Sequence, residues 1–297
     1  MNYCTSRYTM ILRIERYKEV NIRFRWNVFA GENAIHVNMP FNISPDYYFA
    51  IKKVLKVKKL TSHDYIRIGN LEQDGGYIMA HDFNQKDKIA YSFGIWNNVD
   101  WDDDMANRGY EIYMYDPTIE ALPHERKEFH FFQVGLAGKN GGNLRTLDTH
   151  IQENKHDNKQ NMILKMDIEA WEWSFLETVS ENTLNQFDQI IMELHDITGA
   201  CTKETQLKRI AALEKLNKTH HLIHLHANNC GHILTIGNAD IPDVMELTYV
   251  KKSKFEVVED NDIEFPTEID CINDKRRKDW ILGKWNTPFI FEEREDL

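Results

Sequence analysis

Several features that mark particular protein classes are missing from this sequence. No run of about 18 apolar residues occurs, so no transmembrane helix is predicted. The N-terminal stretch MNYCTSRYTMILRIERYKEV has no apolar segment followed by a cleavage site, so we expect no secretory signal. The chain has only 4 cysteines, scattered without C-x-x-C spacing, which indicates free thiols in a reducing compartment and predicts a cytoplasmic protein.

A basic excess is also missing. The chain has 36 Lys and Arg residues against 47 Asp and Glu, a formal net charge of −11. A nucleic-acid-binding surface normally needs a basic face, so we expect no nucleic-acid partner. The balance is uneven, because roughly the first 60 residues are basic while the middle and the end are acidic.

The sequence does contain a regular alternation of apolar strands and helical segments. Its 297 residues, 42% of them apolar, are enough for one sizeable α/β domain with additions. Strands separated by helices predict a mostly parallel sheet with helices on both faces. We divide the chain into a β-rich and helical N-terminal extension (1–60), an α/β domain (61–252) and a C-terminal extension (253–297).

Individual elements are predicted from local patterns. Residues 9–39 alternate apolar and polar side chains, which is typical of half-buried strands. They form either an extra sheet or an arm for dimerisation, and both interpretations stay open, so a homodimer is one candidate assembly. The other predictions are helices over 46–59, 119–127 and 144–153, a helix capped by Thr202, a strand over 129–136 and a last antiparallel strand at the sheet's end over 244–252.

The stretch Ala90–Thr118 has the layout of a cofactor-binding βαβ unit. A strand ends at Gly94, a helix follows with Asp100 as its predicted N-cap, and a second strand ends on Asp116. Such a glycine lets a ligand approach, and such an acid accepts hydrogen bonds from ribose hydroxyls. One glycine does not make the G-x-G-x-x-G pattern that binds pyrophosphate. This favours S-adenosylmethionine over a nicotinamide dinucleotide; the alternative is a ligand-free sheet whose Asp116 caps a turn.

Polar residues gather where the predicted strands end. Ligands of open α/β sheets bind at this edge, and unpaired buried acids and histidines are costly. The resulting candidates are Gly94, Asp116, Asp167, Glu169, Glu193, His195, Asp196 and His226. His195 is the predicted general base for an attacking hydroxyl, with Asp167 or Glu193 orienting its ring. The alternative is that these three bind a divalent cation that acidifies the hydroxyl.

Five motifs carry a resemblance to a known family. They are DGGY at 74–77, YSFGIWNNVDWDDDMANRG at 91–109, YMYDPT at 113–118, LKMDIEAWEW at 164–173 and IIMELHD at 190–196. In this order they make residues 62–252 similar to the FkbM-like S-adenosylmethionine-dependent methyltransferases. The resemblance implies a Rossmann-like class I fold, with Asp167 near the methyl donor. Together with the strand-end argument above, this gives Asp167, Glu193 and His195 as the catalytic candidates. The implied cofactor-binding residues are Asp74, Gly76, Tyr77, Phe93, Gly94, Trp96, Asp116, Pro117 and Asp167.

The sequence departs from the family pattern at two glycine positions. Ala170 stands where the family usually has glycine after D-I-E, and the usual G-x-G is reduced to Gly94 followed by Trp96.

The resemblance also implies the activity: transfer of a methyl group to a hydroxyl of a sugar or nucleotide-sugar, for a capsule or surface polysaccharide. We expect an anionic acceptor to meet basic residues outside the core fold, in the N-terminal block and at 275–278. The competing functions are a nicotinamide-dependent oxidoreductase and a scaffold without a cofactor.

Overall fold

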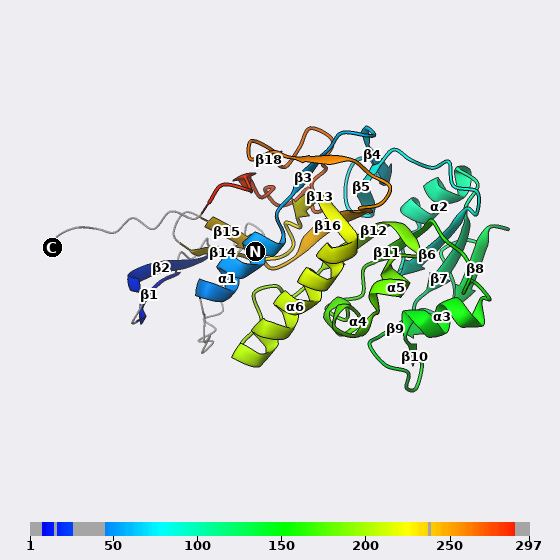
Figure 1. Ribbon diagram of the computed structural model, residues 1–297, viewed down its shortest axis with the longest axis horizontal. Helices are drawn as coiled ribbons and strands as arrows, with labels where there is room; N and C mark the ends of the chain where they lie inside the picture. Colours follow the sequence, from blue (N-terminus) through cyan, green and yellow to red (C-terminus); the bar gives the residue numbers. More distant parts are fainter. Residues whose placement is uncertain (1–7, 15–16, 26–44, 237–238, 289–297) are drawn as a thin grey trace.

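A seven-stranded sheet forms the centre of the computed structural model, which describes residues 8–14, 17–25, 45–236 and 239–288 (Figure 1). The strand order is β13-β16-β12-β11-β6-β7-β8. Neighbours from β12 to β8 are parallel, whereas β16 is antiparallel to both β12 and β13. The strands are β6 (Ile89–Phe93), β7 (Glu111–Tyr115), β8 (Phe129–Phe132), β11 (Met162–Met166), β12 (Phe187–Leu194), β13 (His220–Ala227) and β16 (Met245–Lys251). The predicted α/β class with a mostly parallel sheet is confirmed.

Side chains of the central strands alternate between two cores. On β11, Met162 and Leu164 belong to one apolar cluster and Ile163 to the other. Both β11 and β12 are buried along their whole length. A strand buried on both faces needs a nearly continuous apolar sequence, which is why the two segments were recognisable as strands.

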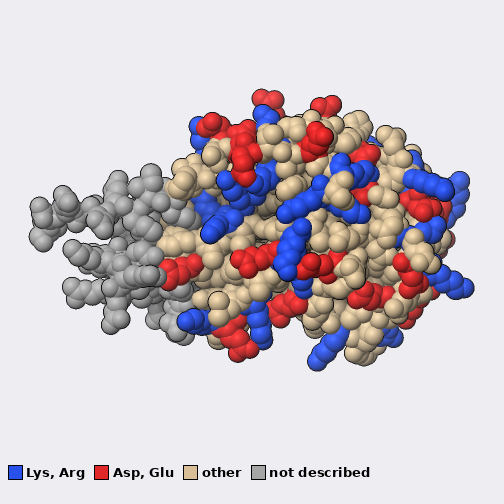
Figure 2. Space-filling model, in the orientation of Figure 1, with Lys and Arg blue, Asp and Glu red and all other residues tan. Residues whose placement is uncertain are grey.

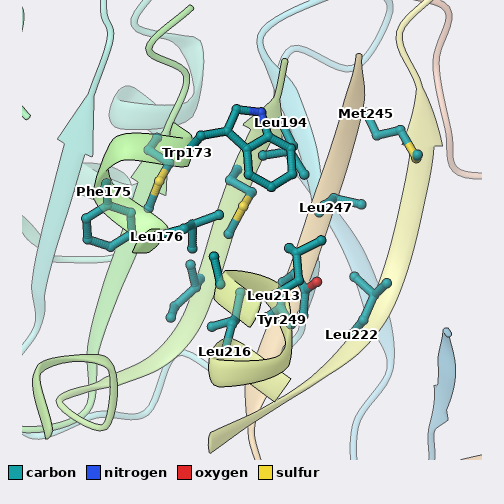
Figure 3. Packing of buried hydrophobic residues seen from close by; sticks show 14 of the residues in the cluster. Trp173, Phe175, Leu176, Leu194, Leu213, Leu216, Leu222, Met245, Leu247 and Tyr249 are labelled. Atoms are coloured by element: carbon teal, nitrogen blue, oxygen red, sulfur yellow. The ribbon is translucent and has the colours of Figure 1, made fainter. Parts of the chain in front are cut away.

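Helices cover the first face of the sheet. They are α1 (Pro45–Val54), α3 (Leu147–Glu153), α4 (Glu172–Thr178) and α6 (Lys203–Thr219), with the short α5 (Glu181–Leu184) beside α6. Figure 3 shows Trp173 of α4 next to Leu194 of β12, and Leu213 of α6 near Tyr249 of β16. Each fully buried side chain of this size contributes roughly 1.5–3 kcal/mol. The predicted cap is confirmed, since Thr202 accepts a hydrogen bond from the backbone of Thr205.

The second face carries α2 (Asp100–Asn107) and the hairpin of β4 (Tyr65–Gly69) and β5 (Gly76–Ala80). Trp101 and Met105 of α2 pack with Met79 of β5 against the sheet. The DGGY motif lies at the end of the hairpin loop, where Gly75 has φ +85°. Described helices therefore lie on both faces, with the hairpin completing the second.

The outer segments pack onto this centre. Strands β1 (Tyr8–Ile14) and β2 (Tyr17–Arg25) form a four-stranded sheet with β14 (Ile233–Ile236) and β15 (Ala239–Pro242), in the order β1-β2-β14-β15. Two-stranded pairs are β3 (Lys58–Leu60) with β17 (Val257–Glu259), β18 (Glu264–Phe265) with β19 (Gly283–Lys284), and β9 (Gly135–Leu136) with β10 (Leu144–Arg145). The β prediction for 9–39 is thus confirmed for β1 and β2, and its remainder lies outside the described residues.

One helix prediction was wrong, and another was right at its start but too long. Residues 119–127 form turns and bends, because Pro123 has no backbone N–H and disfavours helical geometry in the residue before it. The helix predicted over 46–59 ends at Val54. The residues Lys58–Leu60 instead form β3, which pairs with β17.

Three boundaries also differ from the sequence prediction. Helix α3 begins after Thr146, whose side chain caps it, because β10 occupies the two preceding positions. The N-cap of α2 is Val99, and Asp100 is already helical. Strand β8 ends at Phe132.

The last strand, β16, is antiparallel as predicted but is not the edge strand. It lies between β12 and β13 and bonds to both. Nowhere in the described ranges does a helix combine the length and the apolar character that crossing a membrane requires.

Candidate functional site

Three adjacent strands end at one edge of the sheet and bring the predicted site residues together. Gly94 follows β6, Asp167 follows β11, and Glu193 and His195 stand at the end of β12. The register pairs Met166 with Met192, so the next residues, Asp167 and Glu193, lie side by side. Glu193 and His195 are two residues apart and therefore start from the same face of the strand.

Backbone strain is concentrated at this edge. Six described residues other than glycine have positive φ, a conformation that L-amino acids avoid. Four of them follow these three strands: Trp96, Glu169, Ala170 and Asp196. Such strain persists only where the surrounding structure enforces it, and it gathers at functional sites. Trp96 and Ala170 thus adopt a backbone conformation that glycine adopts more readily.

Gly94 fixes the contact between two of the strand ends. Its φ is +78°, and an added Cβ would lie 1.6 Å from the carbonyl oxygen of Asp167. No other residue fits there, so the β6 turn packs directly on the end of β11. Lys165 of β11 donates to the carbonyl of Gly94 over 2.7 Å and strengthens this junction.

Both carboxylate oxygens of Asp116 accept hydrogen bonds from the protein itself. One carboxylate oxygen accepts the backbone N–H groups of Ile95 and Trp96, both at 2.8 Å. The other accepts the backbone N–H and the hydroxyl of Thr118, at 2.8 and 2.6 Å. Burial raises the pKa of Asp116, but these hydrogen bonds outweigh it and hold the pKa below its usual range. Asp116 therefore caps the β6 turn, and its contact with a ribose stays a prediction.

His195 faces a group of carboxylates. Its Nδ1 contacts Oε1 of Glu172 at 3.3 Å, while Nε2 lies 3.9 Å from Asp167 and 3.8 Å from Glu193. Burial lowers the pKa of His195, but the hydrogen bond and charge of Glu172, with further nearby acids, outweigh burial and raise the pKa to about 9.

Asp167, Glu193 and His195, together called the open cluster below, also have the donor set of a metal site. Their ligand atoms all lie within 4.8 Å of one another. Burial raises the pKa of Asp167 to about 6, against the charge of Lys165. Burial and the charges of Asp167 and Asp74 raise the pKa of Glu193 well above its usual range.

Several residues that hold the open cluster were missed from the sequence. Glu172 is fully buried, accepts the N–H of Ile168 at 2.7 Å and orients His195. The indole of Trp173 donates to the carbonyl of His195 at 2.7 Å. Lys165 gave a signal, as a lysine inside an otherwise apolar strand, whereas Glu172 looked like any acid at a helix start.

The loop after β12 is held by more distant parts of the chain. Arg209 of α6 donates to the side chain of Asp196 at 2.6 Å. From α1, the hydroxyls of Tyr47 and Tyr48 donate to the carbonyls of Ile197 and Thr198, at 3.0 and 2.9 Å. The N-terminal helix therefore supports the site from outside.

The remaining residues of the implied cofactor set take different positions. Tyr77 is buried on the hairpin, and burial with the charges of Asp167 and Glu193 raises its pKa. Asp74 accepts a hydrogen bond from Asn273 at 3.2 Å, and Gly76 packs against the carbonyl of Asn70. Three further residues of this set lie elsewhere. The ring of Phe93 is buried in the core, and Pro117 packs near Gly135. The side chain of Trp96 is 71% exposed.

His226 forms a second cluster beside the first. On β16, Glu246 pairs with Glu193 of β12 on one side and with His226 of β13 on the other. Two residues of the C-terminal segment contact this pair. Asp279 lies 3.4 Å from Nε2 of His226, and Asn273 donates a hydrogen bond to Glu246. We call His226, Glu246, Asn273 and Asp279 the closed cluster.

Three of the basic residues predicted to capture an anionic acceptor share their charge with acids. Lys275 pairs with Glu72 at 2.9 Å, and Arg276 and Arg277 both bond to Asp274. Figure 2 shows the same intermixing, with acidic and basic side chains alternating over the face in view. Electrostatic capture of an anion by these residues stays a prediction.

A hollow of about 460 Å³ lies at the opposite edge of the sheet, near the starts of β6 and β7. It is lined by Lys86, Asp87, Lys88, Ile89, Gly109, Glu111, Tyr113, His156 and Lys159. Lys159 pairs with Asp87 there, and Lys88 donates to a backbone carbonyl. Since open α/β sheets bind ligands at the carboxyl ends of their strands, we place the functional site at the other edge. A scan against protein-family models and a search of curated proteins gave no match to this chain.

Proposed function

We propose that this protein is an S-adenosylmethionine-dependent O-methyltransferase that acts on a hydroxyl of a sugar or nucleotide-sugar. The observation that carries the proposal is the acidic and strained strand edge beside the Gly94 turn, where Asp167, Glu193 and His195 meet. The link to a capsule or surface polysaccharide rests on the family resemblance.

The strand order supports a Rossmann-like arrangement. From β6 the chain adds β7 and β8 on one side, then returns to place β11 and β12 on the other. The winding direction reverses between β6 and β11, and open α/β sheets bind ligands at such a point.

The charge of the edge supports S-adenosylmethionine over a dinucleotide. Strand register places Asp167 beside Glu193 and Glu193 beside Glu246, and Asn273 bonds both Glu246 and Asp74, so four carboxyl groups make this edge acidic. A field of this sign attracts a sulfonium ion and repels a pyrophosphate. When bound, S-adenosylmethionine would supply an electrophilic methyl group.

The Gly94 turn and the hairpin fit the role of cofactor-binding elements. The turn is fixed by Asp116 and by the contact of Gly94 with Asp167, so little ordering is needed when a ligand arrives. The exposed indole of Trp96 offers a flat surface on which an adenine ring can stack. Tyr77 bounds the same space from β5.

His195 is the residue proposed to take the proton of the acceptor hydroxyl. Glu172 holds Nδ1, so Nε2 faces the acids of the site. A base must be unprotonated, and a positive charge brought into the open cluster would favour loss of the ring proton. Trp171, 49% exposed and directly after the strained Ala170, is suited to pack on the apolar face of a sugar.

Calorimetry with the full chain tests this function. We expect saturable one-to-one binding of S-adenosylhomocysteine and no binding of NAD⁺ at the same concentration. Binding of NAD⁺ alone would move the protein to the oxidoreductases, and binding of neither ligand would favour a scaffold. Methyl transfer from labelled cofactor to a panel of sugars and nucleotide-sugars then identifies the acceptor.

A further inference from the structure

The open cluster has lone pairs without donors. In the described part of the chain, the carboxylate of Asp167 accepts no hydrogen bond, although its side chain is only 29% exposed. Glu193 is 4% exposed, and Asn228 donates to just one of its oxygens. Nε2 of His195 lies 3.7 to 3.9 Å from three carboxylates, beyond hydrogen-bond range. Each of the three side chains thus has an atom that no protein donor occupies and that a ligand can contact.

The acids around the open cluster favour a positively charged ligand. Asp167 and Glu193 lie next to each other in neighbouring strands, Glu246 pairs with Glu193, and Asn273 bonds both Glu246 and Asp74. Lys165 is committed to the carbonyl of Gly94. Like charges this close disfavour ionisation of the acids unless a cation joins them.

Glu172 prepares His195 as a metal ligand. It is buried without exposed surface, and its Oε1 is fixed by the N–H of Ile168 while it contacts Nδ1 of His195. This leaves Nε2 aimed at Asp167 and Glu193. A histidine whose second nitrogen is held by a carboxylate is the usual arrangement of metal-bound histidines.

We propose that Asp167, Glu193 and His195 bind one divalent cation of the oxygen-preferring kind, Mn²⁺ or Mg²⁺. Two carboxylates and one imidazole suit such an ion, and the cation supplies the charge that the cluster lacks. The site itself does not depend on methyl transfer. Its use, lowering the pKa of the acceptor hydroxyl, rests on the proposed function. Nε2 of His195 would then donate its lone pair to the metal, so His195 would act as a metal ligand and not as the general base.

Mn²⁺ titration of the chelator-treated full chain tests the site, with free Mn²⁺ followed by electron paramagnetic resonance and no cofactor present. We expect one Mn²⁺ per chain. Asp167→Asn, Glu193→Gln and His195→Ala should each weaken binding at least tenfold. Asp100→Asn is the matched control, because Asp100 lies in a separate acidic hollow with Asp103 and Asp104 and should leave binding unchanged. Equal loss in the control, or no loss in the three variants, overturns the proposal.

Glu172→Gln examines the positioning role. The variant keeps the side-chain shape but loses the charge that orients His195, and we expect 10- to 100-fold weaker Mn²⁺ binding. A purely structural Glu172 would lower the unfolding temperature and leave the Mn²⁺ affinity of the folded protein unchanged. Cofactor binding is measured separately in excess chelator. Absence of Mn²⁺ binding with intact cofactor binding refutes only the metal site, and the reverse result refutes only the methyltransferase.

Discussion

The open and closed clusters lie on one row of the sheet, yet the protein completes only one of them. Asp167, Glu193, Glu246 and His226 are neighbours across β11, β12, β16 and β13. The C-terminal segment closes the end at His226 with Asn273 and Asp279. The end at Asp167 is left without donors and is flanked by strained backbone. The difference shows that a buried histidine beside acids does not by itself mark a site; strained backbone and side chains left partly exposed do.

The largest expected effect is a fall in kcat when the histidine of the open cluster is replaced. His195→Ala should lower kcat by roughly 10²–10⁴-fold, because either a base or a metal ligand is lost, and leave cofactor affinity nearly intact. Labelled methyl transfer measures the first and calorimetry the second. His130→Ala, on the exposed edge strand β8, is the control. Recovery with added Mn²⁺ would favour the ligand role, and near-normal turnover would contradict both roles.

The closed cluster should respond in stability instead. His226→Gln keeps a donor but removes the charge between Glu246 and Asp279, and we expect a loss of about 3 kcal/mol in the free energy of unfolding at pH 7. Burial lowers the pKa of His226, but the hydrogen bond with Asp279 and the nearby carboxylate of Glu246 outweigh it and raise the pKa to about 10.

This raised pKa fixes the sign of the pH dependence. The stabilisation is complete below the unfolded value of about 6.5 and is lost as pH rises toward 10. The difference between wild type and His226→Gln in urea unfolding should therefore shrink with rising pH. His221→Gln, half-buried on the same strand, should have little effect. A drop in kcat of the folded His226→Gln protein as large as that of His195→Ala would end the distinction between the clusters.

Histidines without acidic partners give the opposite pH dependence. Burial lowers the pKa values of His150 and His220 to about 4, although each bonds to a backbone carbonyl. Between about pH 6.5 and pH 4 the unfolded chain binds protons that the folded chain does not, so stability falls as pH falls through this window. Each should contribute on the order of 2–3 kcal/mol. His220→Gln should flatten the acid limb in urea titrations; an unchanged limb contradicts the assignment.

Asp116 tests whether a fully bonded acid can also bind cofactor. Asp116→Ala should weaken S-adenosylhomocysteine binding at least tenfold, about 1.4 kcal/mol. Thr118→Val removes one donor from Asp116 and should keep or improve the affinity. If the ribose contact is real, an analogue lacking the ribose hydroxyls should bind wild type and Asp116→Ala equally weakly, because the two losses are not additive. If the two losses of affinity were additive, Asp116 would not contact the ribose and would only cap the β6 turn.

Strain at the open cluster gives the smallest effect. Ala170 has φ +75°, so Ala170→Gly should stabilise the protein by roughly 0.5–1 kcal/mol after the extra entropy of the unfolded glycine is subtracted. Ala211→Gly is the same change on the exposed side of α6, where it should destabilise by about 1 kcal/mol. Thermal unfolding measures both. If both variants changed the stability in the same direction, position 170 would not be strained.

Local patterns predicted much of the fold because they are set by neighbours in sequence. Continuous apolar runs identified β11 and β12, and Thr202 identified the start of α6. The failure at 119–127 had a visible cause in Pro123. The position of β16 could not be read from the chain, since strand order depends on contacts between distant segments.

The sequence by itself determined which chemical groups stand at the strand ends: a glycine after β6, acids after β7 and β11, and a glutamate and histidine closing β12. Only the tertiary structure decided how they are used. Register set Asp167 beside Glu193, a helix turned Glu172 toward His195, and the C-terminal segment covered His226 while leaving His195 uncovered. The reason is physical: residue type fixes charge and hydrogen-bonding capacity, whereas satisfaction of those groups depends on partners that are remote in the chain.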